Sequence, residues 1–295
     1  MATIHGVYVV NVTPFTKDRK VDYPGLAKNI RWLVKQGVHG LIPLGSTGEM
    51  ASLDDAERHK LLDTVMEASG GKVPVMAGAS AETTEKAIEH ARYAKRAGAS
   101  SVMILPPWYY TPEPEEIFDH YRRISDAVDI PILIYNNPWS SKVDIKPGLV
   151  ARLAKLEHVK AIKESTSDIK RITEIRTLTD DGIIIFCGWE DMAYESFMLG
   201  ATGWVCVIGN LFPMEAVELF DLVAEKKDFA KGWTLYKRML PLLRYLEYSN
   251  KSPKAIKHVL DSMDLAGGAC SSPRLPLSEP EKAEVDRMVR EFRGK

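Results

Sequence analysis

One lysine closes an apolar run, a position at which an amine can act as a nucleophile. Lys163 ends the run at residues 159–163, whose apolar content is typical of a strand buried on both faces. If Lys163 points inward, strand alternation puts Ala161 on its face and Lys160 on the other. Burial disfavours the ammonium form, so we expect a lowered pKa and an amine able to attack a carbonyl carbon. The alternative is a strand-end lysine that reaches solvent.

Two further sets of polar groups follow apolar runs. Residues 45–49 read Gly-Ser-Thr-Gly-Glu, and successive backbone N–H groups with the hydroxyls of Ser46 and Thr47 can hold a carboxylate. Tyr135 ends another run and can move protons to and from a carbinolamine oxygen. Each signal alone also fits an ordinary loop or a core tyrosine.

The elements that position these groups repeat along the chain. Helical patterns separate the apolar runs, with predicted helix starts at Asp54 and Thr83 and predicted helix ends at Gly37, Gly98 and Gly200. Alternating strands and helices predict a (β/α)₈ barrel, since the rival doubly wound sheet lacks a G-x-G-x-x-G after its first strand. In such barrels the active site lies at the carboxyl ends of the strands. The eight runs are residues 7–12, 40–44, 73–77, 101–105, 131–135, 159–163, 183–187 and 204–208.

The pattern changes after about residue 214. Residues 215–225, 229–248, 253–263 and 279–292 read as helices without strands between them. Only the first of these is needed to complete the barrel. We therefore predict a barrel with the active site at residues 1–226 and a helical extension at residues 227–295.

Composition narrows the function class. The 39 basic and 40 acidic residues nearly cancel, which argues against a nucleic-acid surface or a polybasic membrane patch. No apolar run is long enough to span a membrane, and three cysteines without a C-x-x-C pair indicate a reduced cytoplasmic protein with cysteines as core residues. Glu190 and Asp191 lack a third ligand nearby, so no metal site is predicted. A small-molecule substrate is the best expectation.

Three motifs in order resemble those of the dihydrodipicolinate synthase / N-acetylneuraminate lyase family. They are Gly-Ser-Thr-Gly-Glu at 45–49, Tyr-Asn-Asn-Pro at 135–138 and Ala-Ile-Lys-Glu-Ser at 161–165, and the resemblance covers nearly the whole chain. It implies that Lys163 condenses with pyruvate and that Tyr135 relays protons. It also implies that Ser46 and Thr47 bind the pyruvate carboxylate, with Ser46 part of the relay.

The same resemblance carries further expectations. Tyr109 resembles the tyrosine that completes the relay from a neighbouring subunit, although a one-residue slip in alignment would select Tyr110. Gly188 and Val205 resemble backbone contacts to the substrate. Glu190 falls where sialic-acid-type lyases contact sugar hydroxyls. The family is usually a tetramer of two tight dimers, and its imine chemistry requires no metal or organic cofactor.

One departure bears on the substrate. Dihydrodipicolinate synthases usually carry an arginine at the position of Ser140, where its guanidinium grips the second substrate's carboxylate. We expect Ser140 still to contact the substrate, but its single hydroxyl cannot bind a carboxylate through two parallel hydrogen bonds as a guanidinium does. Trp139 and Trp108 make the pocket mouth bulkier, and Lys142 replaces a glycine common in the family.

We therefore predict a Schiff-base lyase or aldolase that cleaves or condenses a 2-keto acid, pyruvate plus an aldehyde, through Lys163. One alternative is a dehydratase of a 2-keto-3-deoxy sugar acid, which uses the same imine without carbon–carbon cleavage. Another is dihydrodipicolinate synthase, which Ser140 disfavours. A rival of a different class is a non-catalytic 2-keto-acid-binding protein, against which the intact set of Lys163, Tyr135, Ser46 and Thr47 argues.

Overall fold

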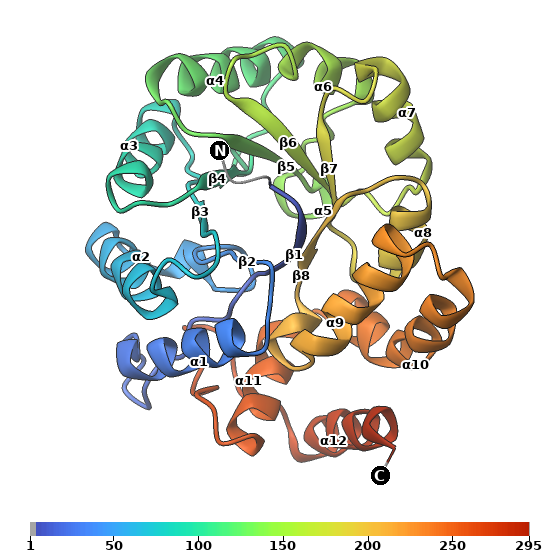
Figure 1. Ribbon diagram of the computed structural model, residues 1–295. Coiled ribbons are helices and arrows are strands. Elements are labelled where there is room, and N and C mark those ends of the chain that lie inside the picture. The colour runs from blue at the N-terminus through green and yellow to red at the C-terminus, as the bar shows by residue number, and fades with distance from the viewer. Residues whose placement is uncertain (1–3, 295) are drawn as a thin grey trace.

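A computed structural model describes residues 4–294 and confirms the barrel. Eight parallel strands form one sheet in the order β2-β1-β8-β7-β6-β5-β4-β3, and a bridge between Leu41 and Val75 joins its two edges (Figure 1). The architecture is therefore a (β/α)₈ barrel. The strands are β1 Gly6–Val9, β2 Gly40–Leu41, β3 Met76–Gly78, β4 Ser101–Ile104, β5 Ile132–Asn136, β6 Val159–Glu164, β7 Ile184–Cys187 and β8 Gly203–Cys206.

Helices surround the strands on the outside of the ring (Figure 1). The longer ones are α1 Tyr23–Lys35, α2 Asp55–Ser69, α3 Thr84–Arg96, α4 Pro114–Ala127, α6 Pro147–Leu153, α7 Lys170–Thr179, α8 Ala193–Met198 and α9 Pro213–Phe220. Short helical turns follow several strands: η1 Met50–Ser52, α5 Pro138–Ser141, η2 Glu190–Met192 and η3 Ile208–Asn210. These turns place polar side chains at the carboxyl ends of the strands.

Local signals account for the helix boundaries. Asp54 and Glu57 form a capping box at the start of α2, and the Thr83 hydroxyl accepts a hydrogen bond from the backbone N–H of Lys86 at the start of α3. Gly37, Gly98 and Gly200 take positive φ angles just beyond helices, as predicted.

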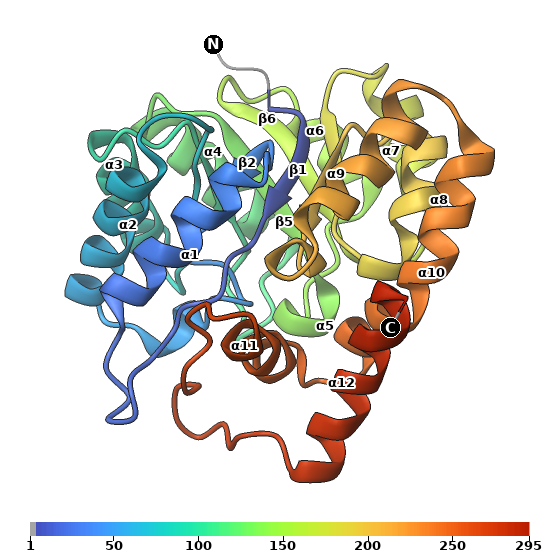
Figure 2. The same ribbon diagram turned by 60° about the horizontal axis from the view of Figure 1, so that its bottom comes forward.

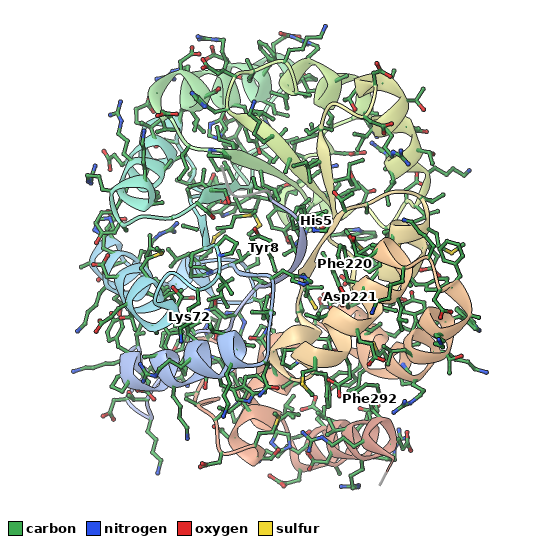
Figure 3. The ribbon with its side chains drawn as sticks, in the orientation of Figure 1. His5, Tyr8, Lys72, Phe220, Asp221 and Phe292 are labelled. Carbon is green, nitrogen blue, oxygen red and sulfur yellow. The ribbon has the colours of Figure 1, made fainter. Side chains whose placement is uncertain are left out.

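Two apolar layers hold the barrel together. One fills the interior of the strand ring and includes Tyr8, which Figure 3 labels. The Tyr8 ring meets that of Phe186 edge-on, with 5.4 Å between the centroids. The other lies between strands and helices and includes Trp204. On β6, Ala161 belongs to the inner layer while Lys160 is exposed, so the predicted alternation is confirmed. Lys163 therefore points into the barrel.

The C-terminal helices cover one end of the barrel. After α9, the chain forms a π-helical turn η4 at Asp221–Glu225, then α10 Phe229–Tyr248, α11 Ser252–Ser262 and α12 Glu279–Arg293. Figure 2 shows α11 next to α5 at the lower end of the barrel, away from the start of β1. The predicted boundary between residues 226 and 227 falls in the turn before α10, and the division into two domains stays a prediction.

Some strand limits were predicted too long. The regular strand β2 ends at Leu41, although the Ile42 N–H still donates to the Val9 carbonyl and the Pro43 carbonyl accepts from the Gly78 N–H. Pro43 has no backbone N–H to continue the ladder, and Leu44 takes a φ of 62°. β8 ends at Cys206, since Val207 already has helical backbone angles. Cys270 is only half-buried, so its assignment to the core is wrong, whereas Cys187 and Cys206 are buried. Within residues 4–294, no helix is both long and apolar enough to cross a membrane.

Candidate active site

Lys163 and Tyr135 lie side by side at the carboxyl ends of β6 and β5. The parallel register pairs the two residues directly, and Lys163 Nζ lies 3.9 Å from the centroid of the Tyr135 ring. Both side chains are nearly buried, with Lys163 6% exposed. The Tyr135 hydroxyl accepts a hydrogen bond of 2.8 Å from Asn137 Nδ2, which fixes the position of its oxygen. An amine and a phenol are thus held together at the barrel mouth.

A pocket of about 260 Å³ opens above this pair. Ser46 and Thr47 from the loop after β2 line it, together with Gly188 after β7 and Ser140 on α5. At Gly188, a Cβ atom would clash with Ser165 Oγ and come within 2.7 Å of Lys163 Cγ and 2.8 Å of the Glu164 carbonyl oxygen. Only glycine leaves room there for the lysine stem.

Two carboxyl groups face the lysine. The Glu190 oxygens accept hydrogen bonds from the backbone N–H groups of Val207 (2.7 Å) and Ile208 (2.9 Å), while its own N–H donates to Glu247 Oε2 at 2.8 Å. Burial raises the pKa of Glu190 to about 8, and the positive charge of Lys163 opposes that rise. Burial also raises the pKa of Glu247, again against the pull of Lys163.

Glu190 thus lines the pocket, but its carboxylate oxygens accept hydrogen bonds from the backbone N–H groups that follow β8. Its predicted role in substrate binding stays a prediction. Glu247, on α10, was not predicted, because only the packing of the C-terminal helices brings it over the barrel. No motif or spacing in the sequence signals that approach.

Ser140 lies on the short helix α5, whose first residue is Pro138. The Asn137 side chain caps this helix by accepting a hydrogen bond from the Ser140 backbone N–H at 3.2 Å. Lys142 ends α5 with a φ of 61°, which explains why glycine suits that position. Trp139 is 73% exposed and is not among the residues that line this pocket; its ring centroid lies 6.1 Å from that of Trp189.

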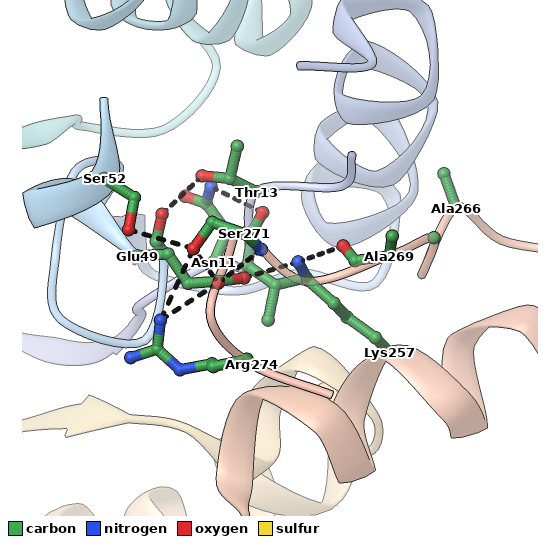
Figure 4. Close-up of polar contacts among 12 residues, drawn as sticks. Asn11, Thr13, Glu49, Ser52, Lys257, Ala266, Ala269, Ser271 and Arg274 are labelled. Atoms are coloured by element: carbon green, nitrogen blue, oxygen red, sulfur yellow. Dashed lines mark hydrogen bonds and ion pairs between the residues drawn. The ribbon is translucent and has the colours of Figure 1, made fainter. Parts of the chain in front are cut away.

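The loop that carries Ser46 and Thr47 is anchored from below by Glu49. The Glu49 carboxylate is fully buried and accepts hydrogen bonds from Lys257 Nζ at 2.5 Å and from the N–H and hydroxyl of Ser271 at 2.9 and 2.6 Å (Figure 4). Arg274 Nη1 adds a contact at 3.1 Å. Lys257, Ser271 and Arg274 all belong to the C-terminal extension. The extension therefore fixes the loop.

Other predicted site residues lie outside this pocket. Tyr109 is 87% exposed, and its backbone N–H donates to Glu82 Oε2 at 3.2 Å. Its neighbour Tyr110 is 52% exposed. Val205 is buried in the inner layer, and Val207 lines the pocket instead. The roles predicted for Tyr109 and Val205 stay predictions. Residues 4–294 contain no group of three His, Cys, Asp or Glu side chains arranged to hold a metal ion.

Comparisons with known proteins place this chain in a family. The model of the Dihydrodipicolinate synthetase family matches residues 3–292. A 4-hydroxy-tetrahydrodipicolinate synthase from Methanothrix thermoacetophila is 33% identical over 281 residues, which cover 95% of this chain and 94% of that protein.

Solved structures agree. The crystal structure of a putative dihydrodipicolinate synthetase from Pseudomonas aeruginosa has a TM-score of 0.95 and 34% identity, covering 98% of this chain and 100% of that one. The dihydrodipicolinate synthase from Acinetobacter baumannii, solved with pyruvate, has a TM-score of 0.93 and 29% identity, covering 98% and 99%. Enzymes of this family form a Schiff base between a lysine and pyruvate and use no external cofactor. The chain belongs to the Dihydrodipicolinate synthetase family and is a lyase.

Proposed function

We propose that this enzyme cleaves or forms a carbon–carbon bond between pyruvate and an aldehyde, through an imine on Lys163. The observation that carries the proposal is the pairing of a buried Lys163 Nζ with the Tyr135 ring at 3.9 Å, in a pocket that Ser46 and Thr47 also line. That arrangement supplies a nucleophile, a proton carrier and hydroxyl groups for a carboxylate in one place.

The steps follow from these positions. Lys163 Nζ attacks C2 of pyruvate, and the Tyr135 hydroxyl, with Ser46, passes a proton to the carbinolamine oxygen, which leaves as water. The imine draws electrons from C3, so loss of a C3 proton gives an enamine that adds to the aldehyde carbonyl. Hydrolysis then releases the longer keto acid, and the reverse sequence cleaves it.

Borohydride trapping tests the proposal. With pyruvate, we expect reduction to leave a stable adduct on Lys163, located by peptide mass spectrometry. Lys163→Ala should abolish the adduct. Lys160→Ala is the matched control, since Lys160 lies on the same strand with an exposed side chain. An adduct that survives in Lys163→Ala would refute the assignment, and failure to trap any keto acid would favour a binding protein.

A second candidate is dihydrodipicolinate synthesis, which the names of relatives such as the Methanothrix protein favour. Ser140 offers a hydroxyl where bidentate recognition of a second carboxylate would need a guanidinium. Product analysis separates the possibilities: 4-hydroxy-tetrahydrodipicolinate, a free aldol adduct, or a dehydrated keto acid formed without carbon–carbon cleavage.

We also propose that the enzyme works as a homotetramer in which Tyr109 completes the proton relay of a neighbouring subunit. The exposure of Tyr109 (87%) and Tyr110 (52%) supports a subunit contact at this loop, because large aromatic side chains favour interfaces. Sedimentation velocity measures the assembly. Tyr109→Phe and Tyr110→Phe, compared in activity, decide which tyrosine takes part.

A further inference from the structure

A second cavity, about 200 Å³ in volume, adjoins the pocket above Lys163. The two cavities share Ser46 and Ser140 in their walls, so the second one lies directly beside the pocket that holds Lys163. The rest of its lining is mainly apolar, with one cation at its edge. These residues are Met50, Ala51, Leu105 and Trp108, with Glu49, Ser52 and Arg274.

The charges around Arg274 do not balance. The single negative charge of Glu49 lies between two cations, Lys257 at 2.5 Å and Arg274 at 3.1 Å. Lys257 is almost wholly buried and makes the shorter contact, so it needs Glu49 as its counterion. Among the described residues that line the second cavity, Glu49 is the only acid, and both its oxygens are already bonded. Arg274 also lines a neighbouring cavity with Asp261, but among the described residues its only ion pair is with Glu49.

The guanidinium of Arg274 also has donors to spare. Its Nη1 reaches Glu49 and the Ser271 hydroxyl, and in Figure 4 the dashed lines meet only this nitrogen. Within residues 4–294, no protein acceptor is bonded to its Nε or Nη2, and the side chain is 40% exposed. A planar fork with free N–H groups, fixed at one nitrogen, matches a carboxylate in two parallel hydrogen bonds.

We propose that Arg274 binds a carboxylate carried by the acceptor aldehyde, at the end remote from its carbonyl group. The substrate class is thus an aldehyde with an apolar body, which packs on Leu105 and Trp108, and an anionic end. Among the described residues that line this cavity Arg274 is the one cation, and its single charge suits a carboxylate better than a doubly charged phosphate. This inference rests on the proposed aldolase function and adds a determinant of specificity to it.

Binding to the pyruvate-locked enzyme tests the proposal directly. Borohydride reduction with pyruvate blocks Lys163. An aldehyde added afterwards therefore cannot form an imine with that amine, and only its non-covalent binding is measured. Calorimetry then compares succinic semialdehyde and 4-carboxybenzaldehyde with their methyl esters. We expect at least one acid to bind about 10- to 100-fold more tightly than its ester, the range of a charge-assisted bidentate contact. Equal affinity for acids and esters would overturn the proposal.

Variants separate binding from support of the loop. Arg274→Gln should remove the preference for the acid and leave ester affinity within about threefold, while Arg274→Lys keeps part of the preference. Arg19→Gln is the matched control, since Arg19 bonds to Ser272 in the same loop but does not line the second cavity. Equal losses for acid and ester in Arg274→Gln would show a supporting role alone. If pyruvate cannot be locked onto the unmodified enzyme, the proposed function itself fails.

Discussion

Replacing Glu49 by glutamine removes the counterion of a buried lysine and tests how the active-site loop is held. Lys257 is almost wholly buried, and Glu49 Oε1 lies 2.5 Å from its Nζ. Burial lowers the pKa of Lys257, and the charge of Glu49 opposes that shift. Without Glu49, the ammonium group must stay charged in a buried site where the Ala269 carbonyl is its remaining hydrogen-bond partner, or lose its proton. Loss of the proton at pH 7 costs about 5 kcal/mol from an ordinary lysine pKa near 10.4.

We therefore expect Glu49→Gln to lower the free energy of unfolding by about 3–5 kcal/mol, the usual cost of breaking a buried pair. Urea denaturation followed by circular dichroism measures it. In the folded variant Lys257 has lost its proton, whereas in the unfolded chain it keeps that proton below about pH 10. The stability of the variant should therefore rise with pH between 7 and 9.5, and the difference from the unmodified protein should become smaller.

A double variant supplies the control. In Glu49→Gln/Lys257→Met no buried charge remains, so we expect stability to return to within about 1.5 kcal/mol of the unmodified protein. The reasoning would be refuted if Glu49→Gln alone were as stable as the unmodified protein at pH 7. It would equally be refuted if the double variant were as unstable as the single one.

Three further predictions concern the pocket. Tyr135→Phe should lower kcat by about 10²- to 10⁴-fold and slow pyruvate trapping, because the proton carrier for imine formation is lost, while the final extent of trapping at saturating pyruvate stays unchanged; unchanged rates of turnover and trapping would reject the relay. Gly188→Ala should lower kcat by about 100-fold with the fold intact, because its Cβ would meet the Glu164 carbonyl oxygen at 2.8 Å and displace Lys163. Glu190 has a pKa of about 8 in the folded protein but an ordinary value of 4.5 in the unfolded chain. Between pH 4.5 and 8 the folded protein therefore binds more protons, and the contribution of Glu190 to stability falls as the pH rises. Relative to the unmodified protein, Glu190→Gln should flatten that fall in urea titrations at pH 5 and 8, and an identical pH dependence in both proteins would contradict the shifted pKa.

The features that could be predicted from the sequence are those determined by residues close together in the chain. The place of Lys163 followed from a buried strand with alternating faces, and Ala161 and Lys160 lie as expected. Helix ends at Gly37, Gly98 and Gly200 followed from backbone freedom that glycine alone provides at little cost.

The C-terminal side of the pocket could not be predicted in this way. Glu247, Lys257 and Arg274 reach the barrel mouth through the packing of α10, α11 and the loop before α12, and nothing near them in the sequence marks a barrel site. Strand ends were also missed where Pro43 removed a donor or Val207 turned helical, because short apolar runs do not show where pairing stops.

The anchoring of the Ser46–Thr47 loop has a consequence for how the chain matures on the ribosome. Glu49 and Lys257 are separated by 208 positions, and Glu49 and Ser271 by 222. Synthesis delivers the barrel strands first, but the partners of Glu49 emerge only with the last part of the chain. Contacts between such distant segments form late and slowly, since a large loop must close before they are gained. Lys163 is therefore synthesised before the residues that anchor the Ser46–Thr47 loop, and the active site can be complete only after the C-terminal extension has been made.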